Sequence, residues 1–127
     1  MNAKFLWSTI TVKSIDSALP FYRDLLGLTM DRRFSPNPNL ELCFLKDENG
    51  IEVELLEHKA PGAVGAAQTP STPANLSLGF QVENLEVMMT ACKAQGIEIV
   101  SGPFEGGGVK FIFVKDPNGV SVQFVEK

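Results

Sequence analysis

The first candidate for chemistry is a carboxylate that lies at a matched position of two similar segments. The stretch FLKDENGIEVELLE (44–57) aligns with FVKDPNGVSVQFVE (113–126) at an offset of 69 residues, and this alignment sets Glu54 against Gln123. A carboxylate on a strand can bind a metal or act as a general base, whereas an amide can only form neutral hydrogen bonds. The pair therefore predicts a polar site in which the first half of the chain supplies the charged residue, Glu54, and the second half supplies the neutral Gln123.

A second pair of segments adds two more candidates. WSTITVKSID (7–16) aligns with SLGFQVENLE (77–86) at an offset of 70, and this sets Trp7 against Ser77. An indole offers a flat apolar wall and one N–H donor, and a serine hydroxyl both donates and accepts. Trp7 and Ser77 are thus matched in the same way as Glu54 and Gln123.

The period of these strands predicts that the candidates share one face. Apolar and polar residues alternate in 52–58 and 121–126, so Glu54 and Gln123 lie on the side opposite the apolar residues. By the same parity Thr9 and Gly79 line the walls of the site, and the lack of a side chain at Gly79 makes room for a ligand.

The elements that must position these residues also come in two sets. Each half reads as strand, helix and three strands, with Ser14 and Asn84 as the N-caps of the two helices. Pro20 would be costly in the middle of a long helix, but it is tolerated in the first turn if the first helix begins near Ser17. The predicted fold class is therefore α+β, with two βαβββ modules and eight strands in all. The predicted boundaries are module 1 (1–58), a Pro/Gly/Ala-rich linker (59–75) and module 2 (76–127), all within a single domain (1–127).

Composition narrows the class of protein. The chain has 127 residues, 44% of them hydrophobic and 20% charged, and a net charge of −4. No apolar run reaches the ~20 residues of a membrane helix, the N-terminus lacks a secretory signal, and no basic stretch suggests nucleic acid. Cys43 and Cys92 form no ligand motif and are expected to be buried and structural. We therefore expect a cytoplasmic protein.

The segment FEGGGVKF (104–111) leaves two interpretations open. No helix follows its glycines, so a phosphate loop is excluded, and a flap over the site and an ordinary hairpin turn both remain. Phe111 and Phe113 share one face of the strand that follows, and the sequence does not decide which face.

With its two βαβββ modules, the stretch FYRDLLGL (21–28) and the DPNG hairpin, the chain resembles the vicinal oxygen chelate superfamily, which includes glyoxalase I, bleomycin-resistance proteins and extradiol dioxygenases. The resemblance implies that the two modules form a curved, cup-shaped mixed sheet of eight strands, with the helices on its outer side. In the metal-dependent members of that superfamily, four side chains inside the cup hold a divalent metal. The resemblance assigns these positions to Trp7, Glu54, Ser77 and Gln123. Only Glu54 belongs to a residue type that usually binds a metal. His58 lies four residues further along the same strand, roughly 13 Å from Glu54, and is too distant to complete a set.

The resemblance therefore implies a metal-free protein without a cofactor, which binds or sequesters a small aromatic or cationic molecule in the cup. It also implies a homodimer, built side by side or by module exchange. One alternative is an enzyme, a lyase, isomerase or dioxygenase-like protein, with an atypical metal site or with Glu54 as the general base. A further alternative is a module that only dimerises or regulates.

Overall fold

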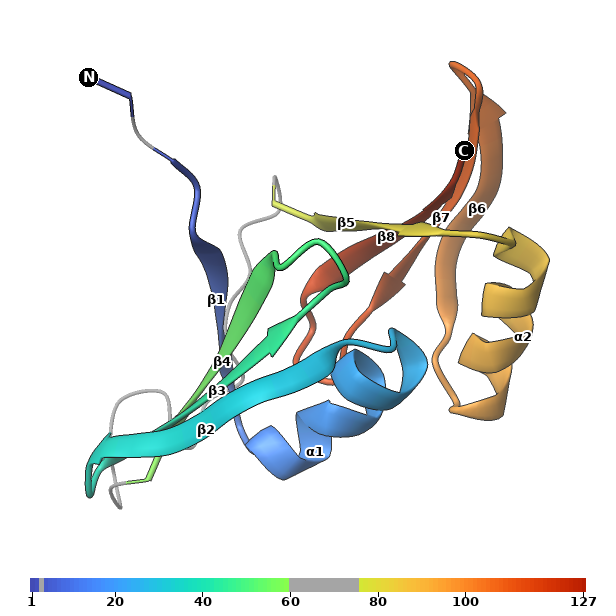
Figure 1. Cartoon of the computed structure of the whole chain (residues 1–127). Helices are drawn as coiled ribbons and strands as arrows, with labels where there is room; N and C mark the ends of the chain where they lie inside the picture. The colour runs from blue at the N-terminus through green and yellow to red at the C-terminus, as the bar shows by residue number, and fades with distance from the viewer. Residues whose placement is uncertain (3, 60–75) are drawn as a thin grey trace. The chain divides into compact units, whose positions relative to one another are not determined.

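The computed structural model describes residues 1–2, 4–59 and 76–127 of the chain. It divides into two compact units, and in each a strand and a helical segment are followed by three strands (Figure 1). The predicted two-module α+β fold is confirmed, with the eight strands forming two four-stranded mixed sheets. The predicted linker 59–75 lies outside the described residues except for Lys59.

The first unit is a sheet in the order β1-β4-β3-β2. β1 runs parallel to β4, and the remaining pairs are antiparallel. The chain passes from β1 into a short α-helix and directly on into a π-helical segment before it returns to the sheet. The elements are β1 (Trp7–Val12), α1 (Ile15–Leu19), η1 (Pro20–Leu25), β2 (Thr29–Asn37), β3 (Leu40–Lys46) and β4 (Glu52–His58).

The second unit has the same topology, with the sheet order β5-β8-β7-β6 and one parallel pair, β5 with β8. The register also agrees, because Thr9 lies opposite Glu54 in the first sheet and Gly79 opposite Gln123 in the second. The elements are β5 (Leu78–Val82), α2 (Leu85–Ala94), β6 (Ile99–Gly106), β7 (Val109–Lys115) and β8 (Ser121–Glu126).

The helix starts are fixed by side chains, as the sequence predicts. The Ser14 hydroxyl accepts a hydrogen bond from the Ser17 N–H at 3.2 Å, and Asn84 Oδ1 accepts one from the Val87 N–H at 3.0 Å. These bonds satisfy N–H groups that have no partner within the helix. A carboxylate from the last strand of each unit adds a further bond: Glu57 accepts from the Ile15 N–H and Glu126 from the Leu85 N–H, both at 2.7 Å.

Pro20 ends the first α-helix. The helix begins at Ile15, directly after its Ser14 cap and not near Ser17, so Pro20 lies beyond the first turn. Proline has no N–H to donate, and α-helical bonding does not continue through it. The chain instead widens into η1, where the Leu26 N–H bonds to the Phe21 carbonyl five residues earlier at 3.0 Å.

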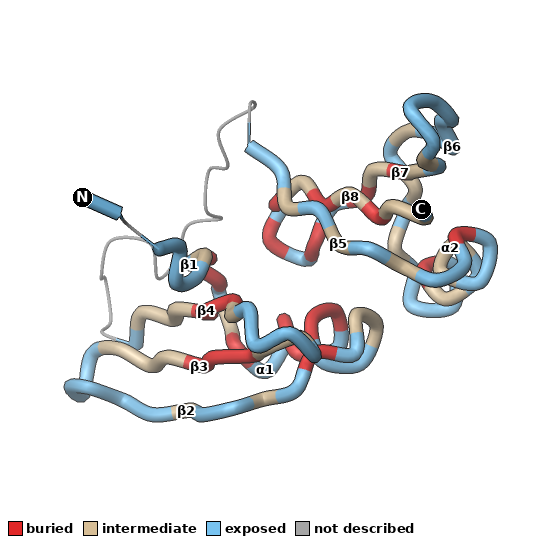
Figure 2. The backbone as a smooth tube through the Cα atoms, turned by 45° about the horizontal axis from the view of Figure 1, so that its top comes forward, coloured by how far each residue is buried: buried red, intermediate tan, exposed pale blue. Residues whose placement is uncertain are grey.

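Each unit has its core between its sheet and its helix. Alternate residues of the strands are fully buried on that side, for example Leu55 in the first unit and Phe124 in the second. Figure 2 shows these buried stretches in red along α1, β3, β4 and β8. The opposite side of each sheet carries the candidate residues, so we call it the open face. Among the described residues, no helix is long and apolar enough to cross a membrane.

Candidate functional site

Glu54 is a buried carboxylate in the middle of β4. Only 8% of its surface is exposed, although it lies on the open face of the first sheet. The parallel register brings Thr9 directly beside it, and Thr9 Oγ1 donates a hydrogen bond of 2.6 Å to Glu54 Oε1. A buried carboxylate needs such a donor, because burial without a partner costs several kcal/mol. Thr9 therefore holds the Glu54 carboxylate in place.

Trp7 stands on the same face of the neighbouring strand. Its side chain is 38% exposed and packs edge-to-face against Phe44, with the ring centroids 5.3 Å apart. Phe44 is paired with Glu54 across β3 and β4. An aromatic wall thus stands directly beside the buried carboxylate.

Two residues of β2 complete this wall. The guanidinium carbon of Arg32 lies 3.8 Å from the centre of the Phe44 ring, which is a close cation–π contact. Phe34 lies parallel to Phe44 at 6.5 Å between centroids. Arg32 Nη1 also forms ion pairs of 2.7 Å with Asp31 and with Glu52.

Sequence reasoning missed Arg32, Phe34 and Phe44 as site residues. Phe44 could have been found from strand parity, because the pairing of β3 with β4 has no register shift. The β2 residues could not, since the register of β2 shifts between Met30 and Arg32 and again between Phe34 and Asn37. A bulge moves side chains to the other face and breaks the period of two on which parity depends.

The open face of the second unit carries the counterpart residues. Gln123 lies opposite Gly79 on one side and opposite Phe113 on the other. Phe111 packs against Phe113 with the rings nearly perpendicular and 5.9 Å apart, so both phenylalanines take the side of Gln123. The structure thus decides which face Phe111 and Phe113 take, a question that the sequence did not answer.

Ser77 and Gly79 are exposed at the start of the second unit. Ser77 comes just before β5, and a Cβ added to Gly79 would meet Gln123 Oε1 at 3.9 Å, which is an ordinary contact. Trp7, Thr9 and Glu54 thus form one set and the second unit holds the other. The convergence of the two sets on one cavity stays a prediction.

The remaining candidates lie in a hairpin turn and in the buried core. FEGGGVKF is a hairpin in which Gly107 and Gly108 form the turn between β6 and β7, and a role as a flap over the site stays a prediction. Cys43 and Cys92 are fully buried, and burial raises the pKa of both thiols. A raised pKa makes a poor nucleophile. In the described part of the chain, no group of three or more His, Cys, Asp or Glu side chains is placed to hold a metal ion.

Comparisons with known proteins agree with this fold. A family model described as the Glyoxalase/Bleomycin resistance protein/Dioxygenase superfamily matches residues 8–113. A protein of Haemophilus influenzae named lactoylglutathione lyase is 28% identical, with 97% of this chain and 92% of that protein covered.

Solved structures show the same architecture. A glyoxalase family protein from Bacillus cereus superposes with a TM-score of 0.85 at 19% identity, over 99% of this chain and 95% of that one. The trypanothione-dependent glyoxalase I of Leishmania major superposes with a TM-score of 0.80 at 21% identity, over 98% and 87% of the two chains. At these identities the likeness concerns the fold alone.

Proposed function

Since the chain belongs to the Glyoxalase/Bleomycin resistance protein/Dioxygenase superfamily, we propose that it is a small-molecule binding protein of this group that works without a metal. The observation that carries the proposal is the open face of the first sheet, where the buried Glu54 carboxylate lies beside an aromatic wall. This arrangement suits a flat aromatic ring or an organic cation.

The donor set at the family's metal positions does not fit a divalent ion. Trp7 has no lone pair for a metal, and Ser77 and Gln123 offer neutral oxygens only. Glu54 supplies one carboxylate, and its Oε1 already accepts the Thr9 hydroxyl. Zinc and related ions bind through three or more nitrogen, thiolate or carboxylate ligands.

The aromatic wall supports a ligand with a ring. Trp7 is exposed enough to stack against a ligand, while Phe44 beneath it is only 4% exposed and holds the indole from below. Aromatic contacts add about 0.5–1.5 kcal/mol beyond the buried area. The carboxylate beside the wall favours a ligand that carries a positive charge or a hydrogen-bond donor.

The proposal is tested by a thermal-shift screen of planar aromatic amines, with tryptamine as the first probe, followed by calorimetry. A ligand at 100 times its Kd stabilises a protein by about 2.7 kcal/mol. Glu54→Gln should weaken binding by about 1–3 kcal/mol through the loss of a charged partner. Trp7→Ala should weaken it through lost stacking, and Trp7→Phe, which keeps a ring, should restore most of the affinity.

A second function, that of an enzyme, is favoured by the likeness to the Haemophilus influenzae lactoylglutathione lyase over nearly the whole of both chains. In that case Glu54 acts as the general base, since it is the only carboxylate buried on the open face of the first sheet as described. An assay of lactoylglutathione lyase activity with elemental analysis separates the two functions. Turnover that is lost in Glu54→Gln while affinity is kept, or a stoichiometric metal removed by Glu54→Ala, would overturn the binding-only proposal.

A further inference from the structure

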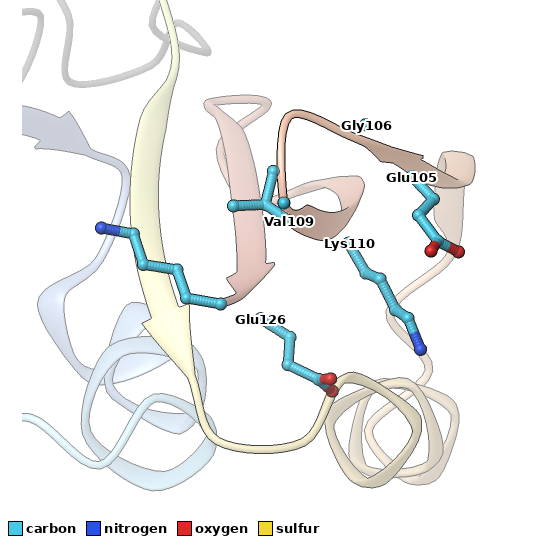
Figure 3. A pocket seen from close by; sticks show the side chains of 7 residues that line it. Glu105, Gly106, Val109, Lys110 and Glu126 are labelled. Atoms are coloured by element: carbon cyan, nitrogen blue, oxygen red, sulfur yellow. The ribbon is translucent and has the colours of Figure 1, made fainter.

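The second unit contains a cavity that the function proposed above does not use. It has a volume of about 580 Å³ and lies between the first turns of α2 and the strands β6, β7 and β8. Its charged lining consists of three carboxylates, Glu86, Glu105 and Glu126, and one ammonium, Lys110. A neighbouring hollow of about 290 Å³ shares Glu105, Lys110 and Glu126 with it (Figure 3).

The first unit fills the corresponding place with the side chain of Arg33. Its Nη1 donates to Asp16 and its Nε to Glu41, both at 2.7 Å. Lys59 bridges Glu41 at 3.1 Å and Glu57 at 2.7 Å. A guanidinium is thus embedded among carboxylates at the start of α1.

The offsets of 69 and 70 residues map this cluster onto the cavity. Asp16 corresponds to Glu86, Glu41 to Lys110 and Glu57 to Glu126, and all three counterparts line the cavity. At an offset of 69 the position of Arg33 falls on Gly102, and at an offset of 70 it falls on Pro103. The strand pairing is consistent with both, because Arg33 is paired with Cys43, and Ile112, the counterpart of Cys43, faces the irregular stretch between Ser101 and Phe104. These correspondences account for the cavity, since neither glycine nor proline can reach into the space that an arginine fills.

The lining indicates what the space would accept. Three carboxylates against one ammonium favour a cation. Glu126 is already engaged, because one of its oxygens accepts the Leu85 N–H, and in Figure 3 its carboxylate points toward the first turn of α2. Glu86 and Glu105 remain as acceptors, and Met89 and Phe104 add apolar surface.

We propose that this cavity binds a small guanidinium compound, whose planar cation takes the place that the Arg33 side chain occupies in the first unit. Glu86 and Glu105 accept its N–H groups, and its alkyl stem lies against Met89. A guanidinium fits better than an ammonium, because its planar fork matches the geometry of carboxylates and it is more weakly hydrated.

The experiment is a calorimetric and NMR titration of the full chain with butylguanidinium chloride. Butylurea, which has nearly the same shape without the charge, is the matched control ligand. We expect saturable binding of butylguanidinium, shifts at the Met89 methyl group and no binding of butylurea. Glu86→Gln and Glu105→Gln should each weaken binding on the order of tenfold. Lys110→Gln should strengthen it, because a like charge is removed.

Asp16→Asn, the counterpart substitution in the first unit, is the matched control variant and should leave the affinity unchanged. Glu86 and Glu105 are exposed, so their glutamine variants should keep the fold. Equal binding of butylurea, the absence of saturable binding, or wild-type affinity in both glutamine variants would overturn the proposal. An equal loss in Asp16→Asn would also overturn it, because it would show a non-specific effect of net charge. None of these outcomes bears on the aromatic wall around Trp7.

Discussion

At the scale of the residue, the buried Glu54 carboxylate depends on its hydrogen-bond partner. The Thr9 hydroxyl meets Glu54 at 2.6 Å, and this short bond to a charged acceptor is of the strong class. We predict that Thr9→Val, which keeps the shape of the side chain and removes the donor, lowers the free energy of unfolding by about 1–3 kcal/mol. Urea denaturation at pH 7 measures this loss.

Thr11→Val is the matched control for that substitution. Thr11 lies on the same face of β1 two residues further on, opposite Leu56 rather than a carboxylate. Its replacement should change the stability by less than about 0.5 kcal/mol. Equal losses in the two variants would show that the Thr9 bond contributes nothing of its own.

The Arg33 cluster carries a pH-dependent prediction. Its hydrogen bonds lower the pKa of Asp16 and of Glu41 relative to their ordinary values, so folding favours the ionised carboxylates. Their stabilisation is present above the unfolded carboxyl pKa of about 4 and is lost as the pH falls through the lowered values. We predict that Arg33→Gln costs up to about 1 kcal/mol at pH 7, and that the difference from wild type shrinks toward pH 3.

Urea titrations at pH 7, 5 and 3 test this prediction. Arg23→Gln is the control, because within the described ranges Arg23 forms an ion pair only with its neighbour Asp24, and both side chains are about half exposed. It should change the stability less at every pH. A cost of Arg33→Gln that stays the same from pH 7 to pH 3 would assign the effect to packing and not to the ion pairs.

The sequence predicted Glu54 and Trp7 as neighbours on one face, and it did so from period and offset alone. It did not identify the partner of Glu54. Thr9, which the sequence placed only in the wall of the site, donates the hydrogen bond to Glu54 in the structure. Parity places residues on a face, but only the register of the parallel pair sets Thr9 directly against Glu54.

At the scale of the element, the caps and hairpins follow local rules, and the sequence predicts them well. Asp47 and Asp116 illustrate this, because each carboxylate accepts two backbone N–H bonds within its own turn. The π-helical stretch after Pro20 could not be predicted in this way. It depends on how the chain continues past a residue that cannot donate, and several continuations satisfy the same local rules.

A glycine in β6 gives a prediction at this scale. Gly102 has φ +99°, and a Cβ there would lie 2.9 Å from the Phe111 carbonyl oxygen and 3.2 Å from the Ile112 Cα. Both neighbours are backbone and cannot move aside cheaply. We predict that Gly102→Ala destabilises the protein by about 1–3 kcal/mol in chemical denaturation.

Gly106→Ala, at the end of the same strand, is the control for Gly102→Ala. A Cβ there would meet nothing within 4 Å, and Gly106 has no positive φ. We expect a change of less than about 0.5 kcal/mol, or a slight gain from the loss of chain entropy in the unfolded state. Wild-type stability of Gly102→Ala would contradict the backbone strain inferred here.

At the scale of the whole molecule, the two units share one topology but differ in the side chains that fill the space between sheet and helix. Thirteen of the buried hydrophobic side chains described lie in the first unit and seven in the second, and the first unit alone has an ion-paired arginine where the second has a cavity. The shared topology follows from pattern, so it could be predicted. The difference arises from single replacements, such as the lack of a counterpart of the Arg33 side chain in the second unit, whose effect on packing no periodicity reveals.

The assembly of the molecule is the last prediction. The outer strands of each sheet, β1 and β2 or β5 and β6, have a neighbour on one side only within their own sheet. Phe5 and Leu6, next to β1, are 77% and 66% exposed. Free strand edges and exposed apolar side chains are typical of surfaces that a second copy covers. We predict a homodimer, with twice the 13.8 kDa mass of the chain.

Size-exclusion chromatography with light scattering at micromolar concentration measures that mass. The double variant Phe5→Ser, Leu6→Ser should shift the equilibrium toward the monomer, because it removes apolar area that association would bury. Val87→Ser, which alters an equally exposed side chain on α2, is the control and should leave the dimer intact. A wild-type mass of 13.8 kDa throughout the micromolar range would contradict the homodimer, and a dimer unaffected by the double variant would place the contact away from the start of β1.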